Sequence, residues 1–180
     1  MQNDAAFIVT PAGPADAYVL AEVHVRAWRE TYPGLLPQAY LDRLSIPIHA
    51  ARWAPRLMRR DEVTLAAEGP DGLVGYCSAE PSRRSGVQKP DGGEMEVTTL
   101  YVLKSAQGEG VGYQLMTQMA RALAARGAAS LVVWVLRENT RARQFYESLG
   151  GVLAGERSEL VGGWAVPSVA YRWGDILAIG

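Results

Sequence analysis

The chain has 180 residues, a length that fits a single domain, since domains usually run to roughly 100–200 residues. Hydrophobic residues make up 48% of the sequence and charged residues 21%, a mixture typical of a folded globular protein. The net charge of −1 argues against nucleic acid or an anionic membrane surface as a partner. We therefore expect residues 1–180 to form one domain that binds neither.

The start of the chain does not resemble a secretory leader. No basic segment precedes an apolar run, and Asp4, Pro11, Pro14 and Asp16 interrupt the alanine-rich beginning. No stretch approaches the roughly 18 uninterrupted apolar residues that a membrane-spanning helix needs. These observations predict a cytoplasmic protein.

The first half of the chain predicts strands mixed with helices. A short apolar run at residues 7–9 ends at a Pro/Gly break, and apolar residues then recur at helical spacing from Asp16 toward Trp28. Turn-forming residues at 69–72 join two apolar runs into a predicted hairpin. Further helices are expected at residues 37–44 and 49–58, and the hairpin strands at 64–68 and 73–80.

The second half predicts alternating strands and helices. Residues 82–93 are polar and glycine-rich, with Arg83, Arg84 and Lys89, and are predicted to form a mobile loop that could also guide an acidic substrate or a cofactor phosphate. Asn139 or Thr140 can cap a short helix. The other expected elements are a strand at 94–103, a helix with Val111, Leu115, Met119 and Leu123 on one stripe, a buried strand at 131–136, and terminal strands at 152–159 and 168–173.

The strongest local signal is the glycine-rich turn Gln107-Gly108-Glu109-Gly110-Val111-Gly112, which lies between a strand and a helix. Glycines let the backbone approach a ligand closely, and the first N–H groups of the helix point outward at its positive end. Such a turn suits a diphosphate, although it can also be a plain connection without a ligand.

The chain resembles the GCN5-related N-acetyltransferases (GNAT family) in two motifs. Gln107, Gly110 and Gly112 match the QxxGxG signature of that family, and residues 139–150 match its second motif through Asn139, Ala142, Phe145, Tyr146, Leu149 and Gly150. The motifs stand in the family's order and separation, and residues 28–37 look like the opening of many bacterial members. The resemblance implies an α/β fold with a mixed central sheet of about six or seven strands and helices on both faces, splayed at the acetyl-CoA site.

The resemblance also implies a cosubstrate site for acetyl-CoA. In the family, this turn holds the pyrophosphate, and the preceding strand receives the pantetheine arm, which Asn139 would also hydrogen-bond. A Rossmann dinucleotide site is the nearest alternative, but its glycine spacing differs and only Glu138 suggests a ribose ligand. The expected cofactor contacts are Leu100, Val102, Gln107, Gly108, Gly110, Val111, Gly112, Asn139 and Tyr146.

For the chemistry, the resemblance implies direct attack of an amine on the thioester. A base must deprotonate the ammonium form, and Glu96 is the first candidate, with Glu94 and Glu30 as alternatives. Tyr146 would give a proton to the departing thiolate, or else be a core aromatic residue. The N–H of Val102 would meet the oxyanion.

The acceptor is expected to be a primary amine of a small molecule or protein, bound near Trp28, Glu30 and Tyr32. Aromatic packing is the simpler interpretation of Trp28 and Tyr32. Two other functions stay open: a non-catalytic acyl-CoA sensor of the same fold, and a partner-binding module that uses the N-terminal helices.

The remaining polar and reactive residues are assigned no catalytic role. His24 and His49 have no second ligand at metal-binding spacing, so no metal is expected and both are predicted to lie on helix surfaces. Cys77 is predicted to be a small core residue. A homodimer is possible by family habit, with Trp164 and Trp173 as exposed aromatic contacts.

Overall fold

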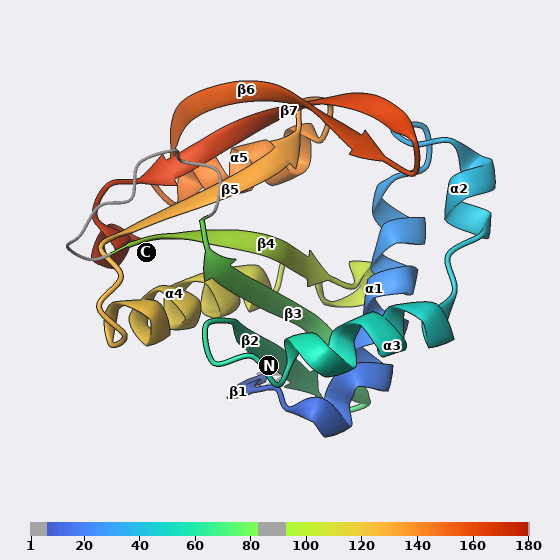
Figure 1. Cartoon of the computed structure of the whole chain (residues 1–180), viewed down its shortest axis with the longest axis horizontal. Helices are drawn as coiled ribbons and strands as arrows, with labels where there is room; N and C mark the ends of the chain where they lie inside the picture. Colours follow the sequence, from blue (N-terminus) through green and yellow to red (C-terminus); the bar gives the residue numbers. More distant parts are fainter. Residues whose placement is uncertain (1–6, 83–92, 180) are drawn as a thin grey trace, which may run out of the picture. The chain divides into compact units, whose positions relative to one another are not determined.

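The computed structural model of the chain describes residues 7–82 and 93–179 (Figure 1). The chain divides into two compact units, each treated by itself below. The first unit comprises Met1–Ser78 and Thr99–Met119, and the second comprises Ala79–Thr98 and Ala120–Gly180. The predicted loop at residues 82–93, with Arg83, Arg84 and Lys89, lies almost wholly outside the described residues.

The seven strands form one mixed sheet in the order β1-β2-β3-β4-β5-β7-β6. The strand β4 pairs in parallel with β5, whereas β1 pairs antiparallel with β2 and β7 pairs antiparallel with both β5 and β6. This mixed sheet with helices confirms the predicted fold class. The strands are β1 (Ile8–Pro11), β2 (Val63–Gly69), β3 (Gly72–Pro81), β4 (Glu94–Val102), β5 (Ser130–Leu136), β6 (Val152–Val161) and β7 (Trp164–Trp173).

The helices follow the predicted order and mostly the predicted bounds. The third helix begins at Ile46 rather than at the expected His49, because Pro47 occupies its first turn, where a proline fits without losing a hydrogen bond. The helices are α1 (Ala17–Thr31), α2 (Gln38–Asp42), α3 (Ile46–Arg56), α4 (Val111–Ala124) and α5 (Thr140–Ser148).

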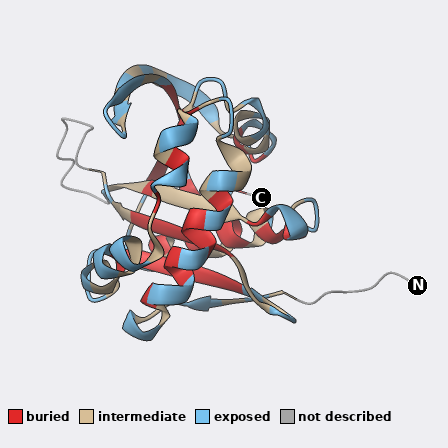
Figure 2. Cartoon of the chain, turned by 90° about the vertical axis from the view of Figure 1, so that its right-hand side faces the viewer, coloured by how far each residue is buried: buried red, intermediate tan, exposed pale blue. Residues whose placement is uncertain are grey.

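The helices bury one side each. In α1 the buried residues recur every three or four positions and include Leu20, His24 and Ala27, so one side of the helix faces its neighbours (Figure 2). In α4 the predicted stripe is confirmed, because its four apolar residues are at most 1% exposed. No helix in the described chain is long and apolar enough to cross a membrane.

The parallel ladder between β4 and β5 ends before either strand does. Among the described residues it joins Glu94–Val97 to Ser130–Val133. β4 then continues to Val102 and β5 to Leu136. An early end to this ladder agrees with the predicted splaying of the two strands.

Candidate active site

The glycine-rich turn of the first unit has the backbone geometry that its sequence predicted. Gly108 and Gly110 have φ angles of +87° and +82°, a region that residues with a side chain rarely adopt. Gly110 O accepts a hydrogen bond from Gln114 N at 2.9 Å, and α4 begins at Val111. The first N–H groups of α4 therefore follow directly on this turn, at the positive end of the helix.

Two side chains fix the entry to this turn. Gln107 Nε2 donates to the carbonyl oxygen of Val102 at 2.8 Å, which closes the chain back onto the end of β4. Glu30 Oε2 accepts from the backbone N–H of Lys104 at 2.7 Å, while Glu30 Oε1 binds Arg26 at 2.9 Å. The structure thus shows Glu30 holding the backbone that leads into the turn, a role that the sequence did not predict.

The first unit also contains an aromatic cluster. It consists of side chains from α1 and its C-cap, from α3, from β3 and from the end of β4. The rings of Trp28, His24 and His49 follow one another, with centroids 5.1 and 4.5 Å apart. The members of the aromatic cluster are His24, Trp28, Tyr32, His49, Tyr76 and Tyr101.

The cluster brings together two predicted substrate residues with one residue of β4. Trp28 and Tyr32 meet with ring centroids 4.9 Å apart, and the Tyr32 hydroxyl lies 3.1 Å from that of Tyr101. Tyr101 stands between Leu100 and Val102, the half-buried residues expected to contact the cosubstrate. Predicted acceptor and cosubstrate contacts therefore adjoin one another within the first unit.

The prediction that His24 and His49 lie on helix surfaces is wrong for His24. His24 is 7% exposed, and its Nδ1 lies 2.6 Å from the Tyr76 hydroxyl. Burial, followed by the charges of His49, Arg56 and Arg52, lowers the pKa of His24 to about 3. Burial and then the Arg52 charge also lower the pKa of the half-buried His49. Both imidazoles are therefore neutral at physiological pH.

The predicted residues of the second unit lie on α5 and β4. Asn139 caps α5, since its Oδ1 accepts from Ala142 N at 3.2 Å. Tyr146 is 5% exposed and packs with ring centroids 5.4 Å from Phe145 and 6.2 Å from Trp173. The packing of the alternative interpretation, a core aromatic residue, is thus present, and the predicted catalytic role would be additional to it.

The acidic residues of β4 differ in their surroundings. Glu94 Oε1 accepts from Arg172 Nε at 2.5 Å, so this alternative base is held in an ion pair. Glu96 is half-buried and pairs in register with Val132 of β5. Because side chains two residues apart on a strand share a face, Glu96 and Glu94 lie on one face of the sheet.

Comparison with known proteins identifies the family. The profile described as "Acetyltransferase (GNAT) family" matches residues 21–151. The chain is 28% identical over 160 residues to an uncharacterized N-acetyltransferase, YuaI, of Bacillus subtilis, covering 89% of this chain and 88% of that protein. It is 31% identical over 124 residues to an uncharacterized N-acetyltransferase of Archaeoglobus fulgidus, covering 69% and 81%.

The chain belongs to the acetyltransferase (GNAT) family.

A solved structure shows the same fold. The PaiA N-acetyltransferase of Thermoplasma acidophilum, in complex with coenzyme A, superposes with a TM-score of 0.70 at 17% identity, over 93% of this chain and 99% of that one. The family profile and the similar sequences confirm the predicted family. They also confirm the predicted class of enzyme, an acetyltransferase.

Other predictions for this GNAT protein have mixed outcomes. Cys77 is fully buried, and burial raises the pKa of its thiol, which confirms a core residue.

Trp173 was expected to be exposed but is 3% exposed, because its indole N–H donates to Leu149 O at 2.8 Å beneath α5. Trp164 is 44% exposed. In the described ranges, no group of three or more potential metal ligands occurs.

Sequence reasoning overlooked several members of the aromatic cluster. His24 and Tyr76 are 52 residues apart in sequence and meet only because α1 packs beside β3. The single local signal was the spacing of His24, Trp28 and Tyr32, which places the three side chains on one side of a helix.

Proposed function

We propose that this GNAT protein transfers an acetyl group from acetyl-CoA to a primary amine of a small molecule or protein. The observation that carries the proposal is the turn before α4, in which Gly108 and Gly110 adopt positive φ angles and Gln107 closes onto Val102. Family membership adds support, as does the coenzyme A bound by the structurally similar PaiA protein.

The residues around the turn fit a diphosphate. Glycines at positions 108 and 110 leave open space where a side chain would stand, so an anion can approach the backbone closely. The N-terminus of α4 adds a partial positive charge without any lysine. The proposed cosubstrate contacts are Leu100, Val102, Gln107, Gly108, Gly110, Val111, Gly112, Asn139 and Tyr146.

Acetyl-CoA supplies the activated acyl carbon, and the chain's own residues move the protons. Glu96 takes a proton from the acceptor ammonium, so that the amine nitrogen can form a bond to the thioester carbonyl carbon. The N–H of Val102 donates to the carbonyl oxygen as negative charge develops there. The C–S bond then breaks, and Tyr146 gives its hydroxyl proton to the departing sulfur. The second proton of the attacking nitrogen is released through water as the amide forms, and the Tyr146 phenolate takes up a proton in return.

The two alternative bases have contacts of their own. Glu94 is paired with Arg172, and Glu30 binds both Arg26 and the Lys104 N–H. Glu96→Gln should lower turnover more than Glu94→Gln, because Glu96 is the proposed acceptor of the ammonium proton.

Calorimetric titration of acetyl-CoA tests the cosubstrate site, with two matched glycine variants. Gly110→Ala and Gly150→Ala introduce the same strain, since their φ angles are +82° and +80° and neither new Cβ would meet an atom within 4 Å. We expect Gly110→Ala to weaken acetyl-CoA binding about tenfold or more, and Gly150→Ala to leave the affinity unchanged. Equal affinities for both variants and the wild type would overturn the assignment of the turn.

A further inference from the structure

The aromatic cluster contains a row of adjoining rings in which both imidazoles are neutral. Trp28 and His24 stack with an interplanar angle of 28°, His49 is tilted by 33° to His24, and Tyr101 meets His24 edge-on at 5.5 Å. The imidazoles carry no charge in this setting. The row therefore offers flat, largely apolar surface rather than a cationic site.

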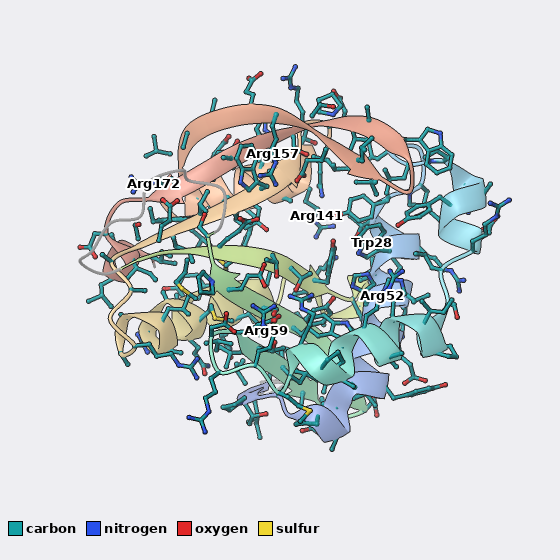
Figure 3. The ribbon with its side chains drawn as sticks, viewed as in Figure 1. Trp28, Arg52, Arg59, Arg141, Arg157 and Arg172 are labelled. Atoms are coloured by element: carbon teal, nitrogen blue, oxygen red, sulfur yellow. The ribbon has the colours of Figure 1, made fainter. Side chains whose placement is uncertain are left out.

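The charge beside this row comes from Arg52. Arg52 is exposed and lies three residues after His49 on α3, the helix that packs against α1 (Figure 3). Its charge acts on both His24 and His49. Within the described part of the chain, Arg52 forms no ion pair. One positive charge thus stands next to the rings without a carboxylate to offset it.

Two acidic residues of the first unit, Glu62 and Glu30, are held by other partners. Glu62 binds Arg56 and also accepts from the Ser78 hydroxyl at 2.8 Å. Glu30 is held by Arg26 and by the Lys104 N–H. Neither carboxylate is therefore available to neutralise Arg52.

The cluster also contains a hydrogen-bond donor that lacks an acceptor. The indole N–H of Trp28 is buried, and among the described residues no atom accepts from it. Buried donors are nearly always paired in folded proteins, because leaving one unpaired is costly. A ligand oxygen at this position would satisfy the donor.

We propose that the aromatic cluster binds the acceptor and that Arg52, together with the Trp28 N–H, selects amines that also carry a carboxylate, as amino acids with apolar side chains do. This inference rests on the proposed acetyl transfer. A single uncompensated positive charge matches a monoanionic carboxylate better than a dianionic phosphate, and a guanidinium can bind both carboxylate oxygens. The rings would contact the apolar side chain.

The position of the cluster fits this role. Tyr101 belongs to both the cluster and β4, and its neighbours Leu100 and Val102 are the proposed cosubstrate contacts. An acceptor seated on the cluster would lie beside the strand that receives the thioester. The positive charge of Arg52 would also lower the pKa of the acceptor ammonium and favour the reactive free amine.

The test compares three amino acids with their carboxamides. L-phenylalanine, L-leucine and L-methionine and the three corresponding amides are titrated calorimetrically into the protein, and their acetylation is followed as thiol release from acetyl-CoA. At least one acid should bind about tenfold or more tightly than its amide, because a charge-assisted hydrogen bond is lost in the amide. If every amide binds as tightly as its acid, the inference is wrong.

Two arginine variants test whether Arg52 causes the preference for the acid over the amide. Arg52→Gln should remove the preference for the acid by raising its Kd and KM about tenfold, whereas Arg60→Gln, which removes another exposed charge just after α3, should leave both unchanged. Equal behaviour of the two variants would overturn the role of Arg52.

Acetyl-CoA binding in the same preparations separates this inference from the proposed function. One outcome is that the protein binds acetyl-CoA and acetylates amines that lack a carboxylate, but does not bind the amino acids. This outcome would overturn the inference and leave the proposed function standing. Binding of an amino acid that depends on Arg52, without any binding of acetyl-CoA, would overturn the proposed function and support the carboxylate site.

Discussion

Each unit of the molecule contains a group of packed aromatic side chains, and the two groups differ in how their polar atoms are satisfied. In the second unit, the α5 aromatic group consists of Phe145, Tyr146, Tyr171 and Trp173. There the Trp173 N–H donates to a carbonyl at 2.8 Å, and the Tyr171 hydroxyl binds both Arg143 and Glu147. In the aromatic cluster of the first unit, the Trp28 N–H has no acceptor among the described residues.

This difference distinguishes an aromatic group that stabilises the fold from one that is proposed to contact a ligand. A satisfied and fully buried ring contributes mainly to the stability of the folded state. A half-buried ring with an unpaired donor contributes less stability and keeps surface free for binding. The two tryptophans therefore make a matched pair for mutation.

The largest expected effect is on stability. Trp173→Ala should lower the free energy of unfolding by about 3–5 kcal/mol, because it removes a buried aromatic side chain and leaves the Leu149 carbonyl unpaired. Trp28→Ala should cost about 1–2 kcal/mol, since Trp28 is only half-buried. Urea denaturation of both variants measures the difference. Equal losses would mean that the two groups do not differ in the way described.

The next largest effect is on turnover. It is tested by comparing two tyrosine variants within the α5 aromatic group. Tyr146→Phe should lower kcat about 100-fold and leave acetyl-CoA affinity unchanged, because it removes the proposed proton donor and keeps the ring. Tyr171→Phe should lower stability by about 1 kcal/mol through the loss of its hydrogen bonds, with little change in kcat. Unchanged turnover in Tyr146→Phe would remove Tyr146 from the mechanism.

A smaller effect concerns pH and the buried imidazole of the aromatic cluster. The pKa of His24 is about 3 in the folded state against 6.5 in the unfolded chain, so between these values the unfolded state binds the additional proton. Stability from this residue is complete above pH 6.5 and falls as the pH is lowered. The loss on going from pH 7.5 to 5 should be about 2 kcal/mol.

Unfolding free energies of the wild type and of His24→Asn, measured across this pH range, isolate the contribution of His24. Asn can present an oxygen near the position of Nδ1 and so keep a partner for Tyr76, but it does not titrate. The variant should lose about 2 kcal/mol less than the wild type between pH 7.5 and 5. Parallel curves would mean that His24 is accessible to protons in the folded state.

The sequence predicted the features that depend on neighbouring residues. The glycines at positions 108 and 110, the buried stripe of α4 and the Asn139 cap are local patterns, and each appears as expected. The two family motifs made the fold class predictable for the same reason.

Features that depend on distant residues were missed. His24 looked like a surface residue because its partner, Tyr76, comes from a strand far along the chain. Trp173 looked exposed because the carbonyl of Leu149 that receives its N–H belongs to the end of α5. Periodicity shows which side of a helix is buried, but not which polar groups meet there.

The most direct test of the central claim is thiol release from acetyl-CoA in the presence of amines, covering amino acids, polyamines, aminoglycosides and short peptides. The account predicts release that depends on the amine, is strongest for amines that carry a carboxylate, and is lost in Tyr146→Phe. No release with any amine, together with no calorimetric binding of acetyl-CoA, would contradict the assignment of this GNAT protein as an acetyl-CoA-dependent acetyltransferase.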